Sequence, residues 1–125
     1  MGTLGLTAMA HDLAAYSADR TSLIARNVAN ADTPGYRARD LPKFADQMDR
    51  APAMRVTRPG HIRPEGAMGN LRPMERGGEM SPNGNDVSLE NEMMEAASAR
   101  QTHEMAISVY SSVRSMMSSA LGRQR

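Results

Sequence analysis

The chain has 125 residues and a formal net charge of +1, so it has the length of one ordinary domain and no overall charge bias toward nucleic acid or membrane surfaces. It contains no cysteine, which excludes disulfides and zinc–thiolate sites. Trp is absent, Tyr and Phe together number four and Met occurs twelve times, a composition that favours helix–helix seams over a dense core because aromatics supply much of a core's buried area.

The first part of the chain has a helical pattern. Its stripe residues recur at steps of three and four, which predicts an amphipathic helix from about Leu4 to Ala31. Pro34 ends the pattern, because the residue before a proline is disfavoured in the α region. We therefore expect residues 1–32 to form an N-terminal helix. The stripe consists of Leu6, Met9, Leu13, Tyr16, Arg20, Leu23, Asn27 and Asn30, widened by Ile24 and Val28.

The stretch NVANADTPGYRARD follows at the end of this helix. Asn27 and Asn30 share one helical face, where side-chain amides can bond exposed carbonyls or a neighbouring chain. Pro34 and Gly35 suit the two central positions of a type II turn, since Gly takes a positive φ without strain. Tyr36 can pack and still form a hydrogen bond. A generic helix stop needs neither both asparagines nor the tyrosine, so this stretch is a candidate functional site.

The middle of the chain, residues 33–87, lacks long periodicity. All seven prolines lie in it, and residues 37–76 hold nine basic and five acidic side chains. The segment MRVTR has the composition of a strand, and LPKFADQM that of a short helical turn. We expect the remainder to be extended, ordered by contact with neighbours, or partly disordered, because a long segment without periodicity is rarely a loop inside a compact domain.

The last part, residues 88–125, predicts a second long helix. Ser88 suits the N-cap, with Glu90 and Glu92 in the first turn, where the helix dipole favours acidic residues. The helix is expected to stop near Gly122. Its three-to-four rhythm is formed by Leu89, Met93, Ala96, Ala97, His103, Ile107, Tyr110, Val113, Met117 and Leu121.

The predicted fold is therefore mainly α. Two long terminal helices pair as an antiparallel coiled-coil-like hairpin and together form one axial core domain, joined by an extended Pro/Gly-rich middle with little regular structure. Such a hairpin is marginal alone, because ordering each residue costs roughly 1–2 kcal/mol of backbone entropy. The pattern favours an assembly subunit over a free-standing enzyme.

Candidate catalytic and metal-binding motifs are missing from the sequence. The three histidines, His11, His61 and His103, have no second ligand at helical spacing, and phosphate-binding loops and nucleophile elbows are absent. We expect no enzyme activity, cofactor, metal or small-molecule substrate. The longest apolar runs, such as Met105–Tyr110, are too short to span a membrane. The segment MGTLGLTAMAHD has no basic region or cleavage site, so we expect no cleaved signal peptide.

Two separated motifs resemble those of the bacterial flagellar basal-body rod proteins. The first lies between Asn27 and Arg37, and the second is NGNDVSLENEM, from Asn83 to Met93, which leads into the terminal helix. The larger distal rod and hook proteins carry domains that 125 residues cannot hold, so the resemblance implies a proximal rod subunit. His103 departs from the pattern, because an aromatic is expected there. The first motif consists of Asn27, Ala29, Asn30, Thr33, Pro34, Gly35, Tyr36 and Arg37.

The resemblance implies a structural role in cell motility. Rod proteins pair their terminal helices in a helical axial structure that spans the periplasm, and they leave the cytoplasm unfolded through the type III export apparatus. The implied partners are other rod proteins, further copies of this chain, the rod–MS-ring adaptor FliE and the export gate. Phe44 and Met48 fit the Phe-x-x-x-apolar motif that the gate recognises. The same pair could instead be a local hydrophobic anchor.

The assembly seams implied by this interpretation combine the two stripes. They comprise Leu6, Met9, Leu13, Tyr16, Leu23, Leu89, Met93, Ile107, Tyr110, Val113, Met117 and Leu121. Two alternatives stay open. A helical adaptor or export chaperone of the same export system would be a stable hairpin as an isolated monomer. A nucleic-acid-binding module using residues 37–76 would lose affinity steeply with salt, and the weak charge bias argues against it.

Overall fold

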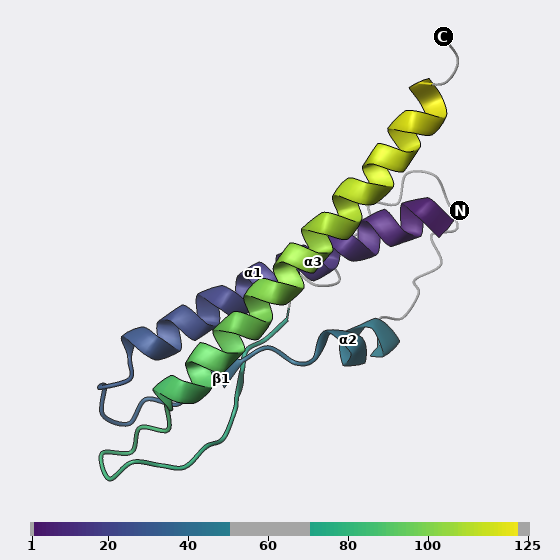
Figure 1. Ribbon diagram of the computed structural model, residues 1–125. Coiled ribbons are helices and arrows are strands. Elements are labelled where there is room, and N and C mark those ends of the chain that lie inside the picture. Colours follow the sequence, from purple (N-terminus) through teal and green to yellow (C-terminus); the bar gives the residue numbers. More distant parts are fainter. Residues whose placement is uncertain (1, 51–70, 123–125) are drawn as a thin grey trace.

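The computed structural model describes residues 2–50 and 71–122. Helices α1 and α3 run antiparallel and pack against each other, with the short elements beside one end of the pair (Figure 1). The predicted mainly-α hairpin is confirmed. The elements are α1 (Gly2–Ala29), β1 (Arg39–Asp40), α2 (Phe44–Arg50), β2 (Met74–Glu75) and α3 (Leu89–Gly122).

The helix ends follow the local sequence closely. α1 ends at Ala29, two residues before the predicted limit, and the next residues tighten into a turn in which the Ala31 N–H donates to the Val28 carbonyl over 3.2 Å. α3 begins directly after Ser88, whose carbonyl accepts from the Glu92 N–H at 2.9 Å and whose hydroxyl lies 3.5 Å from the Asn91 nitrogen. These contacts fit the predicted N-cap.

The seam between the helices combines large residues of α1 with the small residues Ala99 and Ala106 of α3. Buried positions recur at seven-residue intervals on both helices. Small side chains let two helices approach closely, and the seven-residue period keeps one face turned to the partner. The buried seam residues are Ala10, Tyr16, Ser17, Leu23, Ile24 and Asn27 on α1, and Glu92, Ala99, Ala106 and Val113 on α3.

The seam within the chain therefore differs from the apolar rhythm of the C-terminal helix. Tyr16, Leu23 and Val113 are buried as the rhythm predicts, but Leu89, Met93 and Ile107 are exposed, as are the remaining large apolar residues of α3. The face that meets α1 carries Ala99 and Ala106 instead. A stripe of Met and Leu would hold the helices further apart than these alanines do.

Two short strands from the middle of the chain form a small sheet beside the helices. β1 and β2 are antiparallel, with Arg39 opposite Glu75 and Asp40 opposite Met74. The Arg76 N–H extends the pairing by donating to the Ala38 carbonyl at 2.9 Å. Helix α2 confirms the helical prediction for LPKFADQM, whereas the strand predicted at MRVTR lies outside the described residues.

The two ends of the hairpin differ in closure. The last turns of α3 rise away from α1 toward the C-terminus (Figure 1), and the large apolar side chains there are exposed. We call this region the open end and define it by Leu6 and Met9 of α1 and by Tyr110, Met117 and Leu121 of α3. None of the helices in the described ranges is long and apolar enough to cross a membrane.

Candidate functional site

Asn27 is the centre of the closed end of the hairpin. It is wholly buried, and its Nδ2 donates to the Arg39 carbonyl at 2.8 Å and to Glu92 Oε2 at 3.2 Å. Its Oδ1 accepts from the Tyr36 hydroxyl and from the Arg39 N–H, both at 3.1 Å. One amide therefore joins α1, the following loop, β1 and α3. The predicted partners, exposed carbonyls or a neighbouring chain, are here groups of the same chain.

The predicted turn after α1 is present. The Tyr36 N–H donates to the Thr33 carbonyl at 3.3 Å, and Gly35 has φ of +74°. A second turn packs against it: Gly84, with φ of +82°, lies so close that a Cβ there would come within 3.4 Å of Gly35 Cα. The Gly35 N–H donates to the Asn83 carbonyl at 3.0 Å. Glycine is required at both positions by the backbone itself.

Asn85 and Asp86 lock the two turns together. Buried Asn85 donates from Nδ2 to the carbonyls of Asn30 and Thr33, both at 2.8 Å. Buried Asp86 accepts the Ala38 N–H at 2.5 Å, and Arg37 lies 3.7 Å from its other carboxylate oxygen. Residues 27–37 and 83–92 thus form one structural unit, which we call the junction. Of the remaining motif residues, Ala29 and Pro34 are exposed on its outside.

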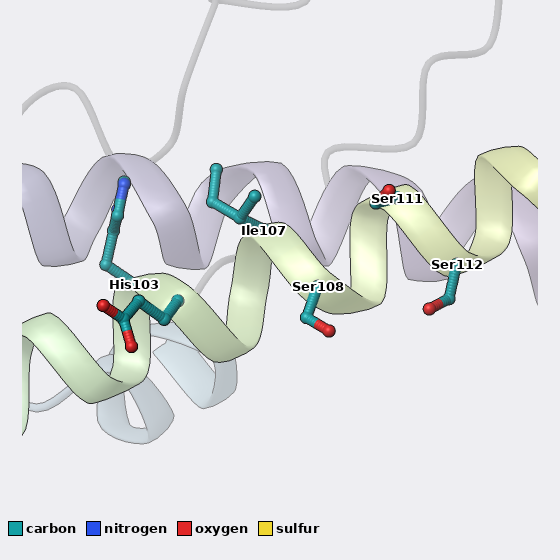
Figure 2. A pocket seen from close by; sticks show the side chains of 6 residues that line it. His103, Ile107, Ser108, Ser111 and Ser112 are labelled. Carbon is teal, nitrogen blue, oxygen red and sulfur yellow. The ribbon is translucent and has the colours of Figure 1, made fainter.

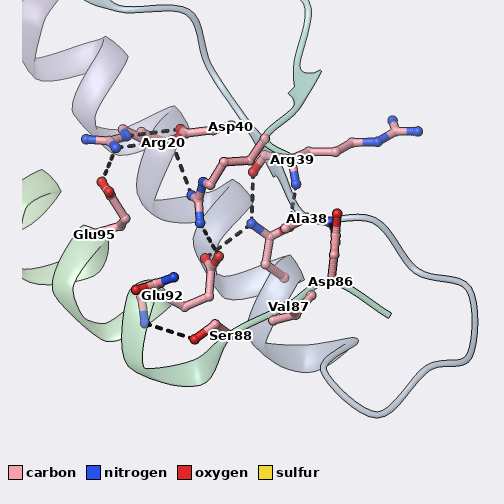
Figure 3. A network of polar contacts seen from close by, with 12 residues as sticks. Arg20, Ala38, Arg39, Asp40, Asp86, Val87, Ser88, Glu92 and Glu95 are labelled. Carbon is pink, nitrogen blue, oxygen red and sulfur yellow. Dashed lines mark hydrogen bonds and ion pairs between the residues drawn. The ribbon is translucent and has the colours of Figure 1, made fainter. Parts of the chain in front are cut away.

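A charge cluster lies beside the junction (Figure 3). Its members are Arg20, Asp40, Arg76, Glu92 and Glu95. Arg20 forms a bidentate pair with Asp40 at 3.0 and 3.1 Å and also binds Glu95. Arg76 pairs with Asp40 at 3.2 Å and with Glu92, whose side chain is 1% exposed. The cluster therefore connects β1 and the residue after β2 to both α1 and α3.

The cluster changes the acidity of Asp40. Burial by itself raises the pKa of a carboxyl group, but hydrogen bonds from Arg20 and the Leu41 N–H, with the charges of Arg20 and Arg76, outweigh it. The pKa of Asp40 is therefore held below its usual 3.8. Folding therefore favours the ionised form of Asp40.

Phe44 and Met48, the candidate export motif, begin and line helix α2. The Phe44 ring lies against Tyr16 of α1, with ring centroids 5.5 Å apart and an interplanar angle of 59°. The Tyr16 hydroxyl donates to the Pro42 carbonyl at 2.7 Å. Phe44 is half-buried by this contact, whereas Met48 is 40% exposed. Phe44 thus forms a local hydrophobic contact with α1, and its role in export stays a prediction.

His103 faces α1, and its Nδ1 lies 3.2 Å from the Ala14 carbonyl, to which it donates as N–H. Figure 2 shows His103 reaching toward α1 while Ser108 and Ser112 point to the other side of α3.

A shallow open groove begins at His103 and runs along α3, lined by His103, Glu104, Ile107, Ser108, Ser111 and Ser112. A flatter one continues at Arg114, Met117, Ser118, Leu121 and Gly122. Both are too open to enclose a small molecule.

The candidate assembly residues fall into separate places. Tyr16, Leu23 and Val113 are buried in the seam, and Leu13 is half-buried. The others face solvent in the single chain, and Leu121 is 78% exposed. These exposed candidates are Leu6, Met9, Leu89, Met93, Ile107, Tyr110, Met117 and Leu121.

Several junction residues were missed by the sequence analysis as sites. Asn85, Asp86, Arg76 and Glu92 carry much of the junction and the charge cluster. The sequence analysis included Asn85, Asp86 and Glu92 in the second motif without giving them a role in a site, and it counted Arg76 only among the basic residues of the middle. Glu92 lies seven residues before buried Ala99, so a heptad count would have placed it in the seam. No comparable sequence signal exists for Arg76.

The described residues hold no group of three or more His, Asp or Glu side chains that could bind a metal ion. The chemistry of the junction is hydrogen bonding and charge pairing, which position backbone rather than activate a substrate. In comparisons with known proteins, no family model matches the chain, and no curated protein matches it at a significant level.

Proposed function

We propose that this chain is a structural subunit of the bacterial flagellar basal-body rod, assembling helically into its proximal part. One observation carries the proposal. The two motifs that resemble rod proteins, 27–37 and 83–93, are far apart in sequence, yet they are joined by the Asn27–Glu92 side-chain hydrogen bond and by the Asn85 amide, which donates to two backbone carbonyls of the first motif. Residues that form one unit in space are expected to be retained together in a family.

The open end supplies a surface for such an assembly. Met117 and Leu121 lie on α3 after Val113, the last buried residue of the seam, and Tyr110, Leu6 and Met9 are also exposed. Neighbouring exposed apolar residues of this kind indicate an interaction site. A contact between different faces of two copies does not close on itself, so its repetition generates a helical filament.

The identity within the family and the partners follow from the same resemblance. The short chain and the segment ADTPGYRARDLPKF are most similar to the proximal rod protein FlgB. The proposed partners are other rod proteins, further copies of this chain, the adaptor FliE and the type III export gate. The proposed location is the rod of the flagellar basal body, reached by export without a cleaved signal peptide.

The proposal is tested by placing the protein in purified basal bodies. A tag is inserted at Gly69 in the source bacterium, and basal bodies are imaged by electron cryomicroscopy. We expect added density around the lowest part of the rod. Normal rods without that density, together with a soluble cytoplasmic pool of tagged protein, would contradict the proposal.

A second candidate function is favoured by one feature of the junction. Its hydrogen bonds are completed within one chain, as a helical adaptor or export chaperone would need to act as a stable soluble hairpin. Circular dichroism of the isolated monomer separates the two. The adaptor requires helical signal from all of α1 and α3, whereas a rod subunit is expected to lose helix at the open end before assembly.

A further inference from the structure

Helix α2 belongs to a short arm, residues 41–50, whose described contacts with the long helices are few. Among all pairs of described elements, α2 packs closely with none. Two interactions join the arm to Tyr16 of α1: the ring contact with Phe44 and the hydrogen bond to the Pro42 carbonyl. Tyr16 is therefore a latch for the arm.

The latch covers apolar surface on the arm. Tyr16 is 8% exposed, in the seam next to buried Ser17, and its ring also contacts Phe44. Phe44 is half-buried, while Met48, one helical turn later, is 40% exposed. In the latched arm Phe44 is therefore the less accessible of the two large apolar side chains of α2.

We propose that the Tyr16 latch makes recognition of the Phe44–Met48 pair conditional on the fold. A receptor groove that takes an aromatic and an apolar side chain one helical turn apart needs both of them free. It can bind the arm only when Phe44 has left Tyr16. The inference rests on the proposed function, in which that receptor is the export gate, and adds a regulatory contact to it.

The chemistry of Tyr16 agrees with a buried latch. Burial raises the pKa of its phenol, with the charge of Arg20 opposing and that of Asp40 adding to the rise. Asp46 on the arm acts in the same direction as Asp40. A raised pKa favours the neutral phenol, so the contribution of Tyr16 to the latch is present below the ordinary phenol pKa of about 10 and is lost as pH rises through the raised value.

The test uses the fact that Phe44 is the only phenylalanine in the chain. Ring-labelled phenylalanine gives one set of nuclear magnetic resonance signals, which report the Tyr16 ring current and the access of a soluble paramagnetic agent. Tyr16→Ala should move the signals toward free phenylalanine and raise the paramagnetic effect about tenfold. Tyr16→Phe should change them less, because it removes only the hydrogen bond. Tyr110→Ala, a tyrosine far from the arm, is the matched control.

Binding to purified cytoplasmic domains of the export gate completes the test. Folded wild-type chain should bind about tenfold more weakly than Tyr16→Ala, and adding Phe44→Ala to that variant should abolish binding. Equal binding by the wild type and Tyr16→Ala would overturn the latch. If no form binds although the resonance data show a released arm, the recognition pair and its partner are wrong. The rod assignment is decided separately by its position in basal bodies.

Discussion

The two ends of the helical hairpin are built from different chemistry. At the junction, the buried side chains of Asn27, Asn85, Asp86 and Glu92 form hydrogen bonds within a single chain, and the turns at Gly35 and Gly84 pack closely. At the open end, large apolar side chains have no comparable cover in the described chain. Directional polar contacts define one geometry, whereas apolar surface accepts a partner with less demand on angle. The junction therefore fixes how the two helices meet, and the open end carries the exposed apolar surface that the proposed assembly would use.

The largest expected change in unfolding free energy comes from removing the Arg76 guanidinium at the closed end. Arg76→Met leaves Glu92, almost fully buried, without its guanidinium, and an uncompensated buried charge costs about 3–5 kcal/mol of unfolding free energy. Urea unfolding followed by circular dichroism measures the change. The double variant Arg76→Met/Glu92→Leu should recover most of the loss, and a double variant as unstable as the single one would contradict the pairing.

A slightly smaller loss of unfolding free energy is expected when the side-chain amide of Asn27 is removed. Asn27→Ala leaves part-buried groups of Tyr36 and Arg39 and the buried carboxylate of Glu92 short of a partner, for an expected cost of about 2–4 kcal/mol. Asn30→Ala is the matched control, because its exposed amide bonds only within its own turn, and it should change stability by less than about 0.5 kcal/mol. Similar effects of the two substitutions would remove the distinction between them.

The turn should respond to a single methyl group. Gly35→Ala places a side chain at φ of +74°, and the expected cost is about 1–2 kcal/mol of backbone strain because no atom blocks the added Cβ. Gly5→Ala in α1 meets open space at helical geometry and should instead stabilise the chain by about 0.5–1 kcal/mol. Thermal unfolding of both variants measures the difference in sign.

The charge cluster predicts acid sensitivity at the closed end. Because the pKa of Asp40 is lower in the folded chain than in the unfolded one, its carboxylate stabilises the fold above about pH 4, and that stabilisation is lost as pH falls through the folded value. Unfolding free energies measured from pH 6 down to pH 2 should fall, and Asp40→Asn should flatten part of the slope. An unchanged slope in Asp40→Asn would mean that other carboxylates dominate.

The smallest effect on stability is expected at the open end. Met117→Ser and Leu121→Ser alter exposed side chains, so each should change the unfolding free energy by less than about 0.5 kcal/mol. Swimming motility and rod assembly should nevertheless be lost in cells carrying the pair. Ser118→Ala, on the same helix turns, serves as the control. Normal assembly with both serines would show that the open end is not the binding surface.

The sequence allowed the helices and the turn to be predicted because both depend on local rules. Periodicity marked the two helices, Pro34-Gly35 marked the turn, and Ser88 marked the start of α3. The partners of Asn27 could not be derived, since they come from segments up to 65 residues away. The seam of α3 was also hidden, because alanines carry a weak apolar signal beside the many methionines.

Hydrogen exchange of the isolated chain, followed by exchange in assembled rods, tests the central contrast most directly. In the isolated chain, backbone amides of residues 20–29 and 92–106 should exchange at least about a hundredfold more slowly than those of residues 114–122, since exchange follows local opening. Assembly should then protect residues 114–122. Equal protection at both ends of the isolated chain, or no gain at the open end on assembly, would contradict the account.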